Sequence, residues 1–459
     1  MKAITSRALV GVLVWMPACG SNSDGLDSAS ATGATHAGGN SSGGASLTGA
    51  GGSQPSGGSE TEVRAGGASS GGANSGGRAS GGGTAGGGES SGGRGIGGSV
   101  VGGGNGAGGE LAGNGGSSNV QCGAHSPSTT ALGYGRGATG GGNATPVVVR
   151  SFEEAESALA AYRSAFKDGE ASTLVVHYDG QFNFGSITDV CAQHTKDAQT
   201  VEIKEVENVT FRGLPGSSAN FGIKVARAKN VIIQNMTMGL LPGGGDSDAI
   251  TLEGNGTNGD VERIWVDHNE LFSSTKDDCE GAGDTEFDGL IDIKKGARNI
   301  TVSYNYLHDH QKTGLIGSSD SDDTERYVTF HHNRYENIVS RTPLQRFGYT
   351  HLFNNYYGKI SSSGINVRMG GVALIEANYF ENALNPVTSR YSSEVGYWDL
   401  RDNFVGTGVS FNTEEDTLAN ADDWQTTRTF PSSELGYDYD VDPAECVKEI
   451  VSQHAGAKL

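Results

Sequence analysis

Basic residues are scarce in this sequence. It has 32 lysines and arginines against 53 aspartates and glutamates, which gives a formal net charge of −21. An acidic surface repels polyanions, so the charge argues against nucleic acid and against an anionic membrane as partners. An acidic substrate would need local basic side chains or bound cations to overcome the overall field.

Cysteine is also scarce, and its few copies lie far apart. The chain has five cysteines, and no C-x-x-C pair occurs. Four of them in an exported chain suggest two disulfides rather than a metal site. Their positions alone leave three pairings open. These four are Cys122, Cys191, Cys279 and Cys446.

Apolar residues are nearly missing from positions 20–119, which consist almost wholly of Gly, Ser, Ala, Thr and Asn. Such a segment cannot offset the entropy of ordering its chain, so a disordered linker is predicted there. Regular apolar residues and most aromatics begin near Val120. Residues 120–459 are therefore predicted to form one globular domain, which is large enough to bury a sizeable core.

Residues 1–19 combine a basic start with an apolar run from Ala8 to Met16. This pattern predicts an export signal that is too short to span a membrane. Cys19 follows the run and resembles a bacterial lipoprotein box, so a lipid anchor at Cys19 is favoured over ordinary cleavage. The expected location is outside the cell or on its surface, including the bacterial outer membrane.

The predicted domain opens with one helix and continues as short strands. Ser151 and Glu154 form a capping box, and apolar residues follow at helical spacing from Phe152 to Phe166. The strands after it are rich in Val, Ile, Thr and aromatic residues and are separated by Gly, Asn and Asp. The chain therefore changes from one helix to an all-β pattern.

An asparagine ends seven of these strands at intervals of 22 to 36 residues, the length of one supersecondary coil and not of a hairpin. The repeat predicts a single-stranded right-handed parallel β-helix, with the asparagines stacked and hydrogen-bonded in a ladder at one turn. The helix near residue 152 is expected to cap the open N-terminal end. The seven are Asn235, Asn269, Asn305, Asn333, Asn355, Asn378 and Asn403.

Two pairs of aspartates accompany the longest intervals of the repeat. Asp246 and Asp248 lie in one inserted loop, and Asp288 and Asp292 follow a second. Inserted loops on one face of a solenoid usually carry its site. Carboxylates with neither Cys nor a conspicuous His ligand suit a hard cation such as calcium, and solvated loop acids are the alternative interpretation.

Isolated basic residues lie in the next coils. Lys312 falls in a polar turn, and Arg341 and Arg346 flank Pro343, so a bent segment is needed to bring them together. From the residues alone, the arginines are more simply interpreted as partners of acidic side chains. The histidines at positions 308, 310, 331 and 332 are interpreted as structural rather than as a transition-metal site.

Four longer motifs follow one another along the chain. They are W-V-D-H-N-E-L at 265–271, V-T-F-H-H-N at 328–333, S-R-T-P-L-Q-R-F-G at 340–348 and H-L-F-N-N-Y-Y at 351–357. These motifs resemble those of the pectate lyases of the first polysaccharide lyase family. The agreement extends from about Gly133 to Lys458, so it covers essentially the whole predicted domain.

The resemblance implies a calcium-dependent pectate lyase that cleaves α-1,4-linked polygalacturonate by β-elimination and releases unsaturated oligogalacturonides. We expect a monomer. The implied calcium ligands are Asp246, Asp248, Asp288 and Asp292. The implied catalytic residues are Arg341, as the Brønsted base, and Lys312, against the substrate carboxylate. The implied substrate contacts are Arg346, Lys294, Arg368 and Tyr391.

The resemblance also implies a disulfide between Cys191 and Cys279. Cys446 matches a family cysteine, and we expect Cys122 to be its partner. Three other functions are alternatives. A pectin lyase would not need the calcium carboxylates, and no second run resembles the signatures of a β-helical hydrolase. A surface-tethered carbohydrate binder without turnover would be free to lose the basic residues.

Overall fold

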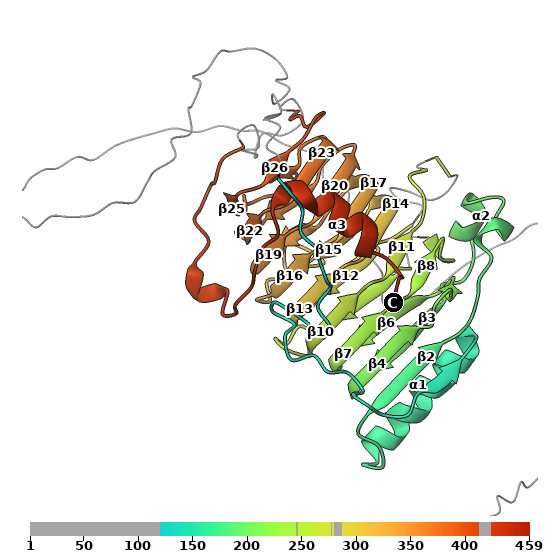
Figure 1. The fold of residues 1–459 in the computed structure, drawn as a ribbon. Coiled ribbons are helices and arrows are strands. Elements are labelled where there is room, and N and C mark those ends of the chain that lie inside the picture. Colours follow the sequence, from blue (N-terminus) through green and yellow to red (C-terminus); the bar gives the residue numbers. More distant parts are fainter. Residues whose placement is uncertain (1–119, 245–246, 277, 280–286, 413–423) are drawn as a thin grey trace, which may run out of the picture. The chain divides into compact units, whose positions relative to one another are not determined.

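The computed structural model describes residues 120–244, 247–276, 278–279, 287–412 and 424–459. Within these ranges the chain forms three sheets of parallel strands along a single stack of coils (Figure 1). A coil contributes one strand to each sheet, so the strands that pair come from successive coils. Parallel crossovers are right-handed, and the architecture is the predicted right-handed parallel β-helix.

The three sheets are named here by number, and their strands are given in chain order. The first sheet contains β1 (Val147–Val149), β2 (Leu174–Tyr178), β4 (Glu207–Gly213), β7 (Lys229–Gln234), β10 (Val261–Asp267), β13 (Ala297–Ser303), β16 (Tyr327–His331), β19 (Tyr349–Phe353), β22 (Val372–Glu376) and β25 (Tyr397–Arg401). The second sheet contains β5 (Ser218–Ala219), β8 (Thr237–Gly239), β11 (Glu270–Phe272), β14 (Tyr306–Lys312), β17 (Arg334–Ser340), β20 (Tyr356–Ile360), β23 (Tyr379–Ala383) and β26 (Phe404–Val405). The third sheet contains β3 (Thr200–Lys204), β6 (Gly222–Ala226), β9 (Ile250–Glu253), β12 (Ile291–Lys294), β15 (Gly314–Ile316), β18 (Leu344–Arg346), β21 (Ile365–Arg368) and β24 (Val387–Thr388).

Inward-facing apolar side chains of all three sheets fill the coil. Ile264 lies level with Ile300 in the next strand, and both are fully buried. In the second sheet the rings of Tyr335, Tyr357 and Phe380 stack at centroid distances of 5.0 and 4.7 Å. Each coil therefore repeats the packing of the one before it, which fixes the height of every outward-facing side chain.

The asparagine ladder is confirmed from Asn269 to Asn403. The side-chain NH2 group of each asparagine donates a hydrogen bond to the side-chain oxygen of the next asparagine at 2.9–3.0 Å. Asn235 was wrongly included in the ladder. Gln234 pairs with Asp267, so Asn235 lies level with His268 and Met236 takes the ladder position. Asn235 instead has a left-handed backbone, with φ 58°, like that of His268.

The predicted helix is present as α1 (Phe152–Lys167). Its N-cap Ser151 accepts a hydrogen bond from the backbone N–H of Glu154, as the capping box predicts. Leu159 and Tyr162 are buried and join the main core. Figure 1 shows α1 beside β2 at the N-terminal end of the stack. That this helix shields the open end stays a prediction.

Two disulfides hold the irregular segments, and both expected pairings are confirmed. Cys122 is bonded to Cys446, and Cys191 is bonded to Cys279. The short helices beside them are η1 (Phe184–Ser186), α2 (Cys191–His194), η3 (Ser432–Glu434) and η4 (Ala444–Cys446).

The C-terminal helix α3 (Val447–His454) lies across the second sheet (Figure 1). Its residues Val447 and Val451 pack against Tyr356 of β20. Among the described helices, none is long and apolar enough to cross a membrane.

Candidate active site

Three aspartates meet where β9 and β12 begin in the third sheet. Asp292 lies within β12 and is buried, whereas Asp248 and Asp288 come just before the two strands. Thr251 of β9 is level with Asp292, so parallel pairing brings the residues that precede β9 beside those of β12. One carboxylate oxygen of each aspartate lies within 4.8 Å of the others.

Neighbouring groups hold these carboxylates in place. Asp248 accepts a hydrogen bond from the backbone N–H of Gly289 at 2.9 Å and another from the hydroxyl of Thr251 at 2.7 Å. Asp292 accepts one from the N–H of Leu315 at 3.2 Å. A Cβ atom at position 289 would lie 2.3 Å from a carboxylate oxygen of Asp292, so a larger residue there would displace that carboxylate.

Lys294 forms ion pairs with two of the aspartates. Its ammonium group lies 2.8 Å from Asp248 and 2.8 Å from Asp292. Burial and the charge of Asp248 raise the pKa of Asp288 to about 6, and the same two causes raise the pKa of Asp292 well above its usual range. When all three carboxylates are ionised, the cluster and the ammonium group together carry two negative charges, which one divalent cation would balance. Oxygen-only donors of this kind fit calcium.

Lys312 and Arg341 come together through the pairing of β14 with β17. Lys312 ends β14 and lies level with Ser340, the residue before Arg341. The backbone of Arg341 is left-handed, with φ 67°, as it is at several other turns of the coil. Burial lowers the pKa of Arg341; Asp292 opposes this effect, and the charge of Arg346 adds to it. Arg341 therefore lies within electrostatic range of the aspartate cluster.

Further predicted residues continue along the third sheet. Arg346 of β18 is in register with Arg368 of β21. Arg346 donates hydrogen bonds to the carboxylate of Asp320 at 2.8 Å and to the carbonyl oxygen of Gly317 at 3.0 Å. Tyr391 follows β24 by three residues, and 62% of its surface is exposed. Arg346 and Arg368 therefore lie at the same position on neighbouring strands of the third sheet.

The described residues of this charged group include neither Asp246 nor the histidines considered as metal ligands. Asp246 lies outside the described residues. Of the histidines, His310 and His331 are buried, and His331 stacks on Phe353 at 5.0 Å. Burial lowers the pKa of His310 to about 4. His310 therefore packs inside the coil, level with a core isoleucine of β17, whereas His331 lies on the outer face of the first sheet beside His332.

No local pattern in the sequence pointed to the residues that support the site. Thr251 and Gly289 hold Asp248, and Asp320 holds Arg346. Asp320 lies in the acidic run S-S-D-S-D-D, which is typical of a solvated loop. Thr251 lies in an ordinary strand. Their roles depend on pairing between coils, which no local spacing reveals.

Comparison with known proteins identifies the family. A family model described as pectate lyase matches residues 122–459. The chain belongs to the pectate lyase family. This pectate lyase family member is therefore a polysaccharide lyase, as the motifs predict. The family assignment agrees with the parallel β-helix.

This pectate lyase chain matches several relatives over nearly the whole length of each relative. "Pectate lyase 3" of Pectobacterium atrosepticum is 41% identical over 355 residues, which covers 72% of this chain and 92% of that protein. The structure of pectate lyase II from Xanthomonas campestris is 53% identical with a TM-score of 0.67 and covers 71% of this chain and 98% of that one.

Two solved structures of pectate lyase C were obtained with ligands. One, from Erwinia chrysanthemi with Ca2+, is 38% identical with a TM-score of 0.65 and covers 72% of this chain and 96% of that one. A variant in complex with pentagalacturonic acid is 38% identical with a TM-score of 0.65 and covers 71% of this chain and 95% of that one.

Proposed function

We propose that this chain is a calcium-dependent pectate lyase that cleaves α-1,4-linked polygalacturonate by β-elimination and releases unsaturated oligogalacturonides. The observation that carries the proposal is the cluster of Asp248, Asp288 and Asp292 within electrostatic range of Arg341. Relatives solved with Ca2+ and with pentagalacturonic acid support the same cation and substrate class.

Calcium would be held by Asp248, Asp288 and Asp292, together with Asp246, which lies outside the described residues. When bound, the cation supplies positive charge against the carboxylate of a uronate sugar. Lys312 adds a second positive charge from the neighbouring coil. The substrate carboxylate thereby gains the stabilisation that it needs when negative charge develops on it.

Arg341 removes the proton from the sugar carbon next to that carboxylate. The electron pair of the broken C–H bond forms a carbon–carbon double bond, and the bond from the adjacent carbon to the glycosidic oxygen breaks. The chain is cut without water, and the departing oxygen takes up a proton. An arginine is a strong base only when neutral, and the burial that lowers the pKa of Arg341 favours that form.

The remaining residues position the polysaccharide. Arg346 and Arg368 lie side by side on successive strands and offer two positive charges to successive carboxylates. Lys294 stands between the aspartates and contacts the substrate from there. Tyr391 offers an exposed ring against which a sugar can pack.

We further propose that the enzyme is exported as a monomer and acts outside the cell or at its surface. Residues 1–19 supply the export signal, and a lipid on Cys19 is the proposed anchor. The Gly- and Ser-rich residues 20–119 act as the spacer. These features rest on the sequence.

The test compares polygalacturonate with highly methyl-esterified pectin, each with calcium and with a strong chelator. Unsaturated product should form fastest from polygalacturonate with calcium and should disappear with chelator. Full activity in chelator would contradict the calcium requirement. Preference for esterified pectin would indicate a pectin lyase, and binding without any product would indicate a carbohydrate-binding protein.

A further inference from the structure

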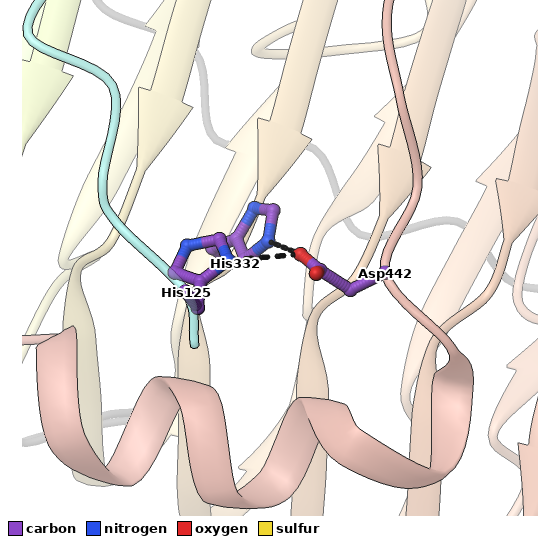
Figure 2. A group of neighbouring side chains, drawn as sticks. All are labelled: His125, His332 and Asp442. Carbon is purple, nitrogen blue, oxygen red and sulfur yellow. Dashed lines mark hydrogen bonds and ion pairs between the residues drawn. The ribbon is translucent and has the colours of Figure 1, made fainter. Parts of the chain in front are cut away.

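A second group of potential metal ligands lies outside the third sheet. His332 follows β16, His125 belongs to the N-terminal segment, and Asp442 belongs to the segment before η4. One ligand atom of each lies within 4.8 Å of the other two. Figure 2 shows both imidazole rings beside the carboxylate of Asp442, with a contact to it from each ring.

The distances within this histidine–aspartate triad are close to those of a metal site. His332 Nε2 lies 2.9 Å and His125 Nδ1 lies 3.1 Å from the same oxygen of Asp442. Tetrahedral zinc with ligand bonds of about 2.0–2.2 Å places neighbouring ligand atoms roughly 3.3 Å apart. The two distances to Asp442 are thus within about 0.4 Å of the spacing that zinc requires, and the two histidine nitrogens lie within 4.8 Å of each other.

The other ring nitrogen of each histidine is already engaged. His125 Nε2 is hydrogen-bonded to the hydroxyl of Tyr304 at 2.8 Å, and His332 Nδ1 is hydrogen-bonded to His331 at 3.0 Å. Metal-bound histidines usually donate this second N–H to a neighbouring group, which fixes the tautomer and the ring orientation. The His332 ring also stacks on Tyr304 and on His125, in both cases at 4.8 Å. The two rings are therefore held in place before any ion arrives.

The surroundings give a cation access and a favourable potential. A cavity of about 460 Å³ is lined by all three residues of the triad and also by Asp438 and Asp440. Additional carboxylates near the cavity attract a cation, and its volume leaves room for water as a fourth ligand.

We propose that His125, His332 and Asp442 bind a divalent transition-metal cation, for which Zn2+ is the best fit. Imidazole nitrogens suit zinc and not calcium, so this site differs in chemistry from the aspartate cluster. The ligands come from three distant parts of the sequence, and Cys122 and Cys446 of one disulfide lie within four residues of two of them. Because the ligands converge only in the folded chain, the ion stabilises the fold and joins both terminal segments to the coil.

The test is a calorimetric titration of the purified full chain with Zn2+ in saturating Ca2+, combined with thermal denaturation. The expected result is one bound Zn2+ and an increase in Tm. His125→Gln should weaken Zn2+ binding at least about tenfold and remove the increase in Tm. The matched control is His177→Gln in β2, which should bind Zn2+ like the wild type.

Asp442→Asn provides the second variant, because His332 is buried and its substitution could prevent folding. Co2+ serves as a spectroscopic probe, since tetrahedral coordination gives an intense visible absorption that an all-oxygen calcium site does not give. This absorption should be lost in His125→Gln and in Asp442→Asn. The proposal is overturned if the wild type binds no Zn2+, if both variants bind it unchanged, or if Ca2+ displaces it.

Discussion

The asparagine ladder and the aspartate cluster are both groups of polar side chains brought together from neighbouring coils, but they are satisfied differently. In the ladder, Asn305 donates to Asn333, and Asn333 donates to Asn355. In the cluster, Asp248 and Asp292 face each other, and Lys294 balances only one of the three carboxylate charges. The ladder residues satisfy one another within the chain, whereas the cluster gathers more acidic than basic groups and is the proposed calcium site. Stacking thus brings complementary side chains together in the ladder and mutually repelling carboxylates together in the cluster.

The largest effect is expected on kcat, from a substitution beside the aspartate cluster. Arg341→Ala removes the proposed base, so kcat on polygalacturonate should fall by about 10²- to 10⁴-fold. The free energy of unfolding should change little. Steady-state kinetics and denaturant unfolding check both. The control is Arg334→Ala in β17, which removes an arginine paired with Glu336 and should keep near-normal kcat. Equal loss in both variants would contradict a catalytic role for Arg341.

A buried charge can also be structural when its partner belongs to the chain. Arg326 is fully buried and forms an ion pair with Asp322. Asp322→Ala would leave that charge without its carboxylate, so the free energy of unfolding should fall by roughly 3–5 kcal/mol. Urea unfolding measures the loss. The neighbouring exposed Asp323→Ala is the matched control and should change stability by less than about 0.5 kcal/mol.

A substitution at the centre of the asparagine ladder tests how much its hydrogen bonds stabilise the fold. Asn333→Ala leaves the amide of Asn305 and the carbonyl oxygen of Val302 without their partner. Stability should fall by about 1–3 kcal/mol, and kcat should stay normal below the melting temperature. Exposed Asn255→Ala serves as the control. A variant with wild-type stability would show that the ladder contributes little.

The pH dependence of activity sharpens the comparison further. Burial and the charge of Arg346 lower the pKa of Arg341, while Asp292 opposes them. A base acts when deprotonated, so kcat/KM should rise with pH on the alkaline side, by up to about tenfold per pH unit below that pKa. Initial rates at saturating calcium give the profile. A profile that falls as pH rises, in protein that remains folded, would contradict this assignment.

The smallest effect is expected on Tm, when a substitution removes the repulsion between Asp292 and Asp248. Asp292→Asn removes a buried carboxylate whose pKa is raised by burial and by Asp248. In chelator the variant should unfold at a temperature equal to or above that of the wild type. Calcium should raise the Tm of the wild type and not that of the variant. Asp323→Asn is the control. A large loss of Tm in chelator would place Asp292 with the ladder as a structural residue.

The repeating parts of the molecule could be predicted from the sequence because each coil repeats one chemical pattern. The spacing of Asn269, Asn305 and Asn333 predicted both the coil and its hydrogen-bonded turn. Asn235 shows the limit of this reasoning. Two adjacent turn positions both favour asparagine, and only the pairing of Gln234 with Asp267 shows which one Asn235 occupies.

The charged site was predictable to the extent that its residues carry a chemical signature. Asp248, Asp288 and Asp292 meet as predicted, whereas Thr251 and Asp320 have ordinary sequence surroundings. The triad at the termini was missed for another reason. His125 and Asp442 lie in irregular segments without periodicity, so nothing in their spacing places them beside His332.

The Cys122–Cys446 disulfide has a mechanical consequence. Cys122 lies 25 residues before β1, and the whole Gly- and Ser-rich segment precedes it. A pull on that segment enters the domain at Cys122 and passes through a covalent bond to Cys446, next to α3. The force is therefore shared with α3, which contacts β17 and β20, and it does not act on the pairing of β1 with β2 alone. Under the proposed attachment at Cys19, drag on the domain would reach both Cys122 and Cys446 and would not act on the first strand alone.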